Sequence, residues 1–131
     1  MPARMGTGPK DTVSGASRPQ WTFANLEEAL RKNGLSPIGA GPVRQPFLGA
    51  EGVLYRIGET ELQAYLYADA GAVARDTDPL DTTRVAPSTM QISWRMQPTL
   101  IVDDNMVVIL LTRDDALRKG IRSAIEESHR D

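Results

Sequence analysis

The acidic segment 75–84, with the sequence RDTDPLDTTR, contains the first residues of this 131-residue chain whose types and spacing suggest chemistry. Asp76, Asp78 and Asp81 bring carboxylate oxygens close together, and oxygen is the ligand that calcium prefers. In an EF-hand loop, however, a glycine occupies the sixth position and a glutamate the twelfth. Here the third aspartate comes late, Pro79 intervenes, and Pro87 takes the twelfth position. The pattern favours a solvated loop with Asx turns, with a calcium site as the alternative.

A second acidic pair, Asp114-Asp115, follows directly after the most apolar run of the chain, residues 106–111. Thr112 or Asp114 can accept hydrogen bonds from the N–H groups in the first turn of a following helix. The helix dipole also favours negative charge at that end. A metal-binding or catalytic role would need a third ligand or a base from elsewhere, and the sequence indicates none. We therefore interpret the pair as the start of a helix.

Nucleophilic and cofactor chemistry has little support in the residue types. The chain has no cysteine and one histidine. This excludes disulfides, zinc-thiolate sites, iron–sulfur clusters and Cys–His catalysis, and it argues against Ser–His catalysis. The glycines match neither a phosphate-binding loop nor a dinucleotide fingerprint. We expect no cofactor, and the alternative hypothesis is a small enzyme or metal-dependent domain that uses the acidic loop at 76–81 or the Asp114-Asp115 pair.

Tyrosine, arginine and glutamine side chains recur at alternate positions of the predicted strands. Such side chains are favoured at recognition surfaces because they combine a large contact area with hydrogen bonding. They predict either an ordinary solvated sheet face or a site for a protein or small ligand. The candidate binding residues are Arg56, Tyr65, Tyr67, Gln91 and Arg95, with Gln63 and Ser93 on the same predicted face.

The elements that would position these residues follow from hydrophobic periodicity. A first helix is capped by Thr22 or Asn25 and ends at Asn33-Gly34. Alternating residues predict a hairpin over 52–58 and 61–68, and the clearest alternation, over 90–97, predicts a strand with Trp94 on its core side. Further strands are expected over 43–48, 99–102 and 106–111, a short helix from Ala70 to about Arg75, and a last helix over about 114–128.

This order predicts an α+β domain. We expect two layers, with an antiparallel sheet of four to five strands, helices on one face, and the order α-β-β-α-β-β-α. Residues 1–20 are rich in Pro, Gly, Ser and Thr, and we interpret them as a flexible leader or linker before a single domain over 21–131.

The charge balance limits the partners. The 15 basic and 17 acidic residues give a formal net charge of −2, without the concentrated basic surface that nucleic acid requires. The longest apolar run is far shorter than the ~20 residues of a membrane span. We expect an unknown protein or small ligand as partner, no nucleic acid and no membrane insertion; the oligomeric state stays open.

Three stretches resemble a small domain of bacterial envelope lipoproteins of unknown function: EALRKNGLSP, VRQPFLGAEGVLYRIGETELQAYLYADAGAV and STMQISWRMQPTLIVDDNMVVILLTRDDAL. Together they cover about residues 26–117. Gln45-Pro46-Phe47 is similar to a QPF motif of that family, and Asp114-Asp115 to its closing Asp pair. The chain departs from the family at Gln97-Pro98-Thr99, where the family often has PPH, and it lacks the lipobox cysteine.

The resemblance implies an envelope location and no particular activity. We therefore expect a non-catalytic binding or interaction module of the bacterial cell envelope. The alternatives are a small cytoplasmic ligand-binding protein and a metal-dependent enzyme that uses the acidic loop.

Overall fold

The computed structural model describes residues 20–130, without the side chains of residues 129 and 130. The leader expected over 1–20 therefore lies outside the described residues, apart from Gln20. The helices are α1 (Phe23–Lys32), α2 (Ala70–Thr77) and α3 (Asp115–Arg130). The strands are β2 (Ile38–Val43), β3 (Gly52–Ile57), β4 (Thr60–Leu66), β5 (Leu80–Asp81), β6 (Ala86–Pro87), β7 (Pro98–Asp103) and β8 (Met106–Leu111).

Five strands form one antiparallel sheet in the order β2-β3-β4-β8-β7, and β5 pairs with β6 in a small second sheet. This confirms the predicted α+β class and antiparallel sheet. All six residues of β8 are buried, as expected for a central strand that is apolar on both faces. Without β5 and β6 the order is α-β-β-β-α-β-β-α, with three strands before α2 where the predicted order has two.

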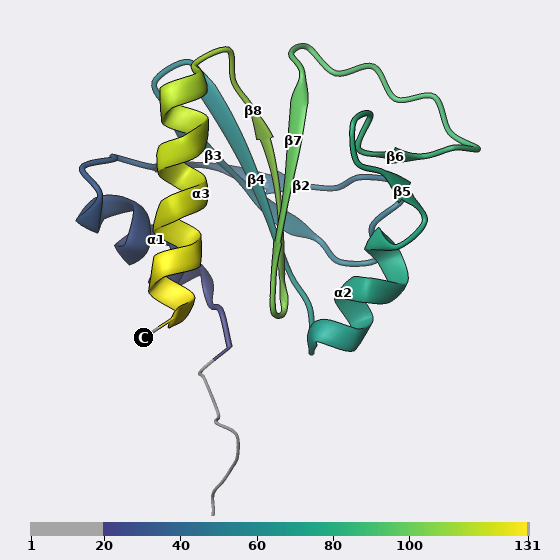
Figure 1. Ribbon diagram of the computed structural model, residues 1–131, viewed down its shortest axis with the longest axis horizontal. Helices are drawn as coiled ribbons and strands as arrows, with labels where there is room; N and C mark the ends of the chain where they lie inside the picture. The colour runs from purple at the N-terminus through teal and green to yellow at the C-terminus, as the bar shows by residue number, and fades with distance from the viewer. Residues whose placement is uncertain (1–19, 131) are drawn as a thin grey trace, which may run out of the picture.

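The helices cover both faces of the sheet (Figure 1). One core lies between the sheet and the pair α1 and α3, which contact each other, and it includes Leu26, Ile121 and Ile125. A second core lies on the opposite face, where α2 contributes Val73 and the segment 82–97, which is irregular apart from the two-residue strand β6, contributes Val85 and Trp94. The predicted placement of all helices on one face therefore holds for α1 and α3 and is wrong for α2.

Local chemistry explains most of the confirmed elements. The Thr22 hydroxyl accepts a hydrogen bond from the Asn25 N–H at 3.1 Å, and the Asn25 side chain accepts one from the Thr22 N–H at 2.8 Å. This capping box starts α1. Between β3 and β4, Gly58 has a φ of 62°, the left-handed conformation that a two-residue hairpin turn needs at this position. The predicted hairpin is confirmed.

The first edge strand lies outside its predicted place. We expected a strand over 43–48 and a loop before it, but β2 runs through Ile38–Val43 and contains two glycines and Pro42. Its register against β3 shifts between Gly39 and Pro42. Pairing with β3 stabilises this segment despite its composition, and a proline is tolerated because β2 is an edge strand.

The predicted strand over 90–97 is also wrong. These residues do not pair with any strand in the described part of the chain, although their accessibility alternates: Gln91, Ser93 and Arg95 are exposed, whereas Trp94 and its neighbours of the same parity are partly buried. Trp94 packs edge-on against Phe47, with ring centroids 6.4 Å apart. The alternating exposure is therefore explained by an extended segment with one side packed against the second core. Hydrogen-bonded pairing with another strand is not needed for such a pattern.

Candidate functional site

Two of the three aspartates of the predicted cation cluster, Asp76 and Asp81, hold loops in place through their carboxylates. Asp76 Oδ2 accepts hydrogen bonds from the Tyr67 hydroxyl at 2.8 Å and from the Gly49 N–H at 2.7 Å. Asp81 Oδ1 accepts from the N–H groups of Thr83 and Arg84, and the N–H group of Arg84 is the main reason that the pKa of Asp81 lies below its ordinary value.

Asp78 follows α2 as its C-terminal cap residue. Across residues 20–128, no three side chains of the His, Cys, Asp and Glu types converge on a point where a metal ion could bind. The structure therefore gives no support to the calcium alternative.

The predicted recognition face exists but is covered. The β3–β4 register places Arg56, Gln63 and Tyr65 on one face of the sheet, as expected from their parity. Tyr65 is fully buried, however, and its hydroxyl donates to the Gln63 side chain at 2.6 Å. Burial raises the pKa of Tyr65 and keeps it neutral. Tyr67 is half-buried, and Gln91 lies exposed on the covering segment 82–97. The expectation of an open sheet face is therefore wrong.

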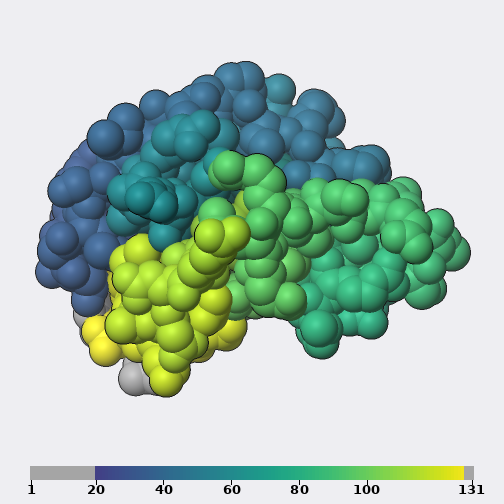
Figure 2. Space-filling view, turned by 90° about the horizontal axis from the view of Figure 1, so that it is seen from above, coloured from purple at the N-terminus to yellow at the C-terminus, as the bar shows by residue number. Residues whose placement is uncertain are grey.

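Two of the five candidates, Arg56 and Arg95, line a pocket of about 780 Å³ at one end of the sheet. The pocket lies where the β3–β4 turn, the segment before β7 and the start of α3 come together, and Figure 2 views the molecule from this end. Its lining residues are Arg56, Ile57, Gly58, Glu59, Thr60, Arg95, Met96, Thr112, Arg113, Asp114 and Leu117.

Glu61 pairs with two of the three arginines of the pocket. Its carboxylate lies 3.5 Å from Arg56 Nη1 and also contacts Arg95. The Glu61 side chain is only 13% exposed, whereas the side chains of Arg56 and Arg95 are 56% and 66% exposed. This ion pair ties the covering segment 82–97 to the β3–β4 hairpin and fixes one positively charged wall of the pocket.

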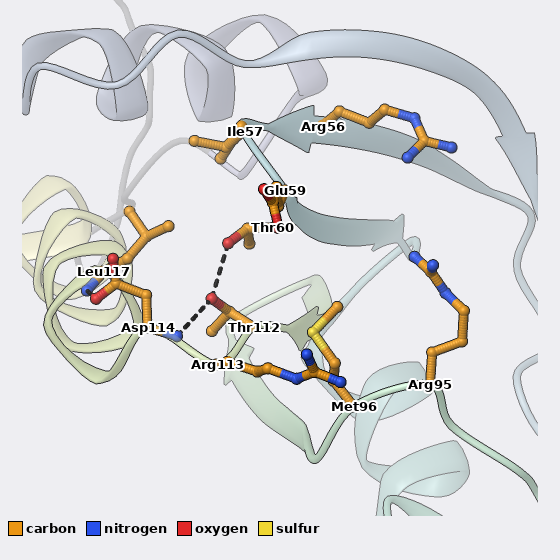
Figure 3. Close-up of a pocket in the computed structure, with 11 residues that line it drawn as sticks. Arg56, Ile57, Glu59, Thr60, Arg95, Met96, Thr112, Arg113, Asp114 and Leu117 are labelled. Atoms are coloured by element: carbon orange, nitrogen blue, oxygen red, sulfur yellow. Dashed lines mark hydrogen bonds between the residues drawn. The ribbon is translucent and has the colours of Figure 1, made fainter.

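Arg113 is the third arginine and behaves differently. It is exposed and makes no ion pair or hydrogen bond with any residue that the structure describes. Figure 3 shows that the three arginines come from three different segments and that Met96 lies beside Arg113. The guanidinium of Arg113 is therefore available to a partner.

The opposite wall carries a chain of hydrogen bonds, drawn in Figure 3. The Thr112 hydroxyl accepts from the Asp114 N–H at 3.1 Å and lies 2.7 Å from the Thr60 hydroxyl. Asp114 Oδ1 accepts from the Leu117 N–H at 3.0 Å, so Asp114 is the cap of α3 as predicted. Both threonines are buried. The hydroxyl chain therefore links the hairpin to the start of α3.

Asp115 does not line the pocket, and its carboxylate contacts other residues of α3. Its carboxylate pairs with Lys119 at 3.2 Å and with Arg118 at 2.7 Å, and these cations, Lys119 first, lower the pKa of Asp115. The acidic pair thus starts and stabilises a helix, and only Asp114 borders the pocket.

Sequence reasoning missed Thr60, Thr112 and Arg113 as pocket residues, and Glu61 as the partner of two pocket arginines. The Arg56–Glu61 pair could have been predicted from the sequence, because a two-residue turn at Gly58-Glu59 places these two residues opposite each other. No local pattern in the sequence indicated that Arg113 would line this pocket. Its place in the same pocket lining as Arg56 depends on the pairing of β4 with β8, which lie about fifty residues apart in sequence.

Comparison of the chain with known protein families, with curated proteins and with solved structures finds no significant match. Within residues 20–130, no helix is long and apolar enough to cross a membrane.

Proposed function

We propose that this chain is a non-catalytic binding module and that the pocket between the β3–β4 turn and the start of α3 is its ligand site. Its volume of about 780 Å³ falls in the range of roughly 300–1,000 Å³ that is typical of small-molecule sites. Ile57, Met96 and Leu117 provide apolar contacts, and the arginines and threonines provide directed polar groups. The observation that carries the proposal is this convergence of polar groups from separate segments on one hollow.

Two of the three carboxylates at or beside the pocket, those of Asp114 and Glu61, are committed to structural contacts, which favours binding over catalysis, and the third, Glu59, is exposed on the pocket rim. Asp114 is engaged as a helix cap, and Glu61 is engaged by two guanidinium groups. A general base needs a carboxylate directed at the reacting proton, and a nucleophile needs an adjacent base. The same contacts supply a rigid frame, which is what ligand recognition requires.

A fragment screen with the ¹⁵N-labelled chain tests this proposal. We expect fragments to shift the amide resonances of residues 57–60 and 112–114. Glu59→Trp, an exposed residue of the pocket rim, should block this binding by occupying the hollow, whereas Glu126→Trp on the exposed side of α3 should not. Shifts that map elsewhere, or equal binding to both variants, would contradict the proposal.

We further propose that the module works in the bacterial cell envelope, and this proposal rests on the resemblance to envelope lipoproteins alone. Fractionation of cells that express the native gene product with a C-terminal epitope tests it. Recovery with the membrane or periplasmic fraction supports the envelope, and recovery with the cytoplasm supports the alternative of a cytoplasmic ligand-binding protein.

A further inference from the structure

The polar groups of the pocket are mainly hydrogen-bond donors. Three guanidinium groups line it, against the two carboxylates of Glu59 and Asp114, and Asp114 already caps α3. Glu61, just beside the lining residues, compensates Arg56 and Arg95 but leaves Arg113 without a counter-ion among the described residues. With Glu61 included, three carboxylates balance the three guanidinium groups in formal charge, and Glu59 lies exposed on the rim of the pocket. What the site offers an anion is the guanidinium of Arg113, which makes no ion pair within the described residues.

The threonine pair supplies a second, independent donor. Thr60 and Thr112 carry one hydroxyl hydrogen each, and their mutual hydrogen bond uses one of the two. The only other partner of these hydroxyls in the described residues is the Asp114 N–H, which is itself a donor. Whichever threonine donates to the other, one hydroxyl hydrogen has no acceptor. Both side chains are more than nine-tenths buried and line the pocket.

A buried donor without an acceptor is costly, and an acceptor-rich ligand would remove that cost. A carboxylate or a phosphate matches both observations, because it can accept two parallel hydrogen bonds from a guanidinium and a further one from a hydroxyl. Met96 and Leu117 beside these donors favour an apolar body attached to the anionic group. This step rests on the proposed ligand site and deepens it.

We infer that the ligand of this pocket carries an anionic group, a carboxylate or a phosphate, which is bound by Arg113 and by the uncommitted hydroxyl hydrogen of the Thr60–Thr112 pair. Arg56 and Arg95, held by Glu61, contribute positive potential at longer range. The recognition is charge-assisted, so it weakens as ionic strength rises.

Three matched probes test this inference on the full chain: benzoate, phenyl phosphate and the neutral benzamide. We expect at least one of the two anions to bind about five- to tenfold more tightly than benzamide, as measured from amide shifts of residues 57–60 and 112–114. The better of the two anions identifies the class of the group. Arg113→Gln should reduce the preference for the anion to less than about twofold, and Arg122→Gln, on the exposed side of α3 away from the pocket, should leave it unchanged.

Either threonine alone still offers one uncommitted hydroxyl hydrogen, so the variant that tests this donor is the double change Thr60→Val with Thr112→Val, which removes both hydroxyls at constant size and should weaken anion binding about threefold. If this variant does not fold, the Arg113→Gln comparison still decides the question. Equal binding of benzamide and the two anions, or an unchanged preference in Arg113→Gln, would overturn the inference and leave the proposed ligand site standing. If none of the probes shifts these amides, the inference is also overturned, and the neutral fragments of the earlier screen test the ligand site separately.

Discussion

The two faces of the central sheet are covered in different ways. On one face, α1 and α3 contribute buried side chains that pack on alternate residues of β4 and β8, and the helices satisfy their own backbone hydrogen bonds. On the other face, α2 covers only part of the surface, and the irregular segment 82–97 covers much of the rest. An irregular segment that lies over a core must satisfy its backbone groups by other means.

Side chains supply those means on the irregular face. The Trp94 indole donates to the Arg84 carbonyl at 2.8 Å, Arg84 donates to the Met90 carbonyl at 2.7 Å, and Gln97 donates to the Thr83 carbonyl at 2.9 Å. Val85 is buried at a φ of 51°, a strained conformation for a β-branched residue. The helical face thus depends on apolar packing, whereas the irregular face also depends on a few specific contacts.

The largest effect should come from a cavity under the helices. Leu110 is fully buried in β8 among the residues of the helical core. We expect Leu110→Ala to lower the free energy of unfolding by about 3–4 kcal/mol in urea denaturation, because neighbouring side chains can relax only partly. A loss below about 1 kcal/mol would show that the helical face is not the dominant core.

Replacing Trp94, which anchors segment 82–97, should lower the free energy of unfolding by less than the Leu110 change and should affect mainly that segment. Trp94 is half-buried and holds segment 82–97 through both ring contacts and its indole N–H. We expect Trp94→Ala to cost about 2 kcal/mol and to increase amide hydrogen exchange within 82–97 while α3 stays protected. Gln91→Ala, an exposed position of the same segment, serves as the control. Equal loss of protection in α3 would mean that the two faces unfold together.

The cap of α3 should contribute less than either core. Asp114→Ala removes the acceptor of the Leu117 N–H. The expected loss in the free energy of unfolding is about 1 kcal/mol, measured by thermal or urea denaturation. Asp114→Asn keeps an acceptor and should recover most of the loss. A larger effect of Asn than of Ala would contradict the capping role.

The ion pair between the irregular segment and the hairpin should be weaker still. Glu61→Gln removes the charge that holds Arg56 and Arg95. Because both arginines are well exposed, we expect a loss of only about 0.5 kcal/mol in stability. The same change leaves more positive charge at the pocket and should strengthen anion binding a few-fold. A decrease in anion affinity would argue against the positive potential assigned to these arginines.

The smallest expected effect is a difference in the salt dependence of two carboxylate pKa values. One carboxylate, Asp81, lies on the irregular face, and the other, Asp115, lies at the start of α3 on the helical face. Asp81 has its pKa lowered first by the N–H of Arg84, and Asp115 has its pKa lowered first by Lys119. In each case the folded pKa lies below the ordinary 3.8, so the carboxylate stabilises the fold above that pH, and this contribution is lost as the pH falls through the folded pKa. NMR titration should show that added salt raises the pKa of Asp115 more than that of Asp81. Equal salt responses would contradict the two assigned causes.

Short-range chemistry in the sequence was sufficient for part of this protein. The Thr22 cap, the turn at Gly58-Glu59 and the Asp114 cap each depend on contacts within about five residues, and the apolar pattern of 106–111 identified the central strand. The structure confirmed all of these. They also determined the α+β class, because periodicity reports which side of an element is buried.

Tertiary structure decided the rest. The segment 38–43 is a strand only because β3 pairs with it, and 90–97 is not a strand because it packs Trp94 and Met96 against one face of the sheet and pairs with neither edge strand. The burial of Tyr65 and the presence of Arg113 in one pocket lining with Arg56 and Arg95 depend on strand pairings between distant segments. Alternation tells which side chains point the same way, but it does not tell what packs over them, since that depends on contacts with residues far away in the chain.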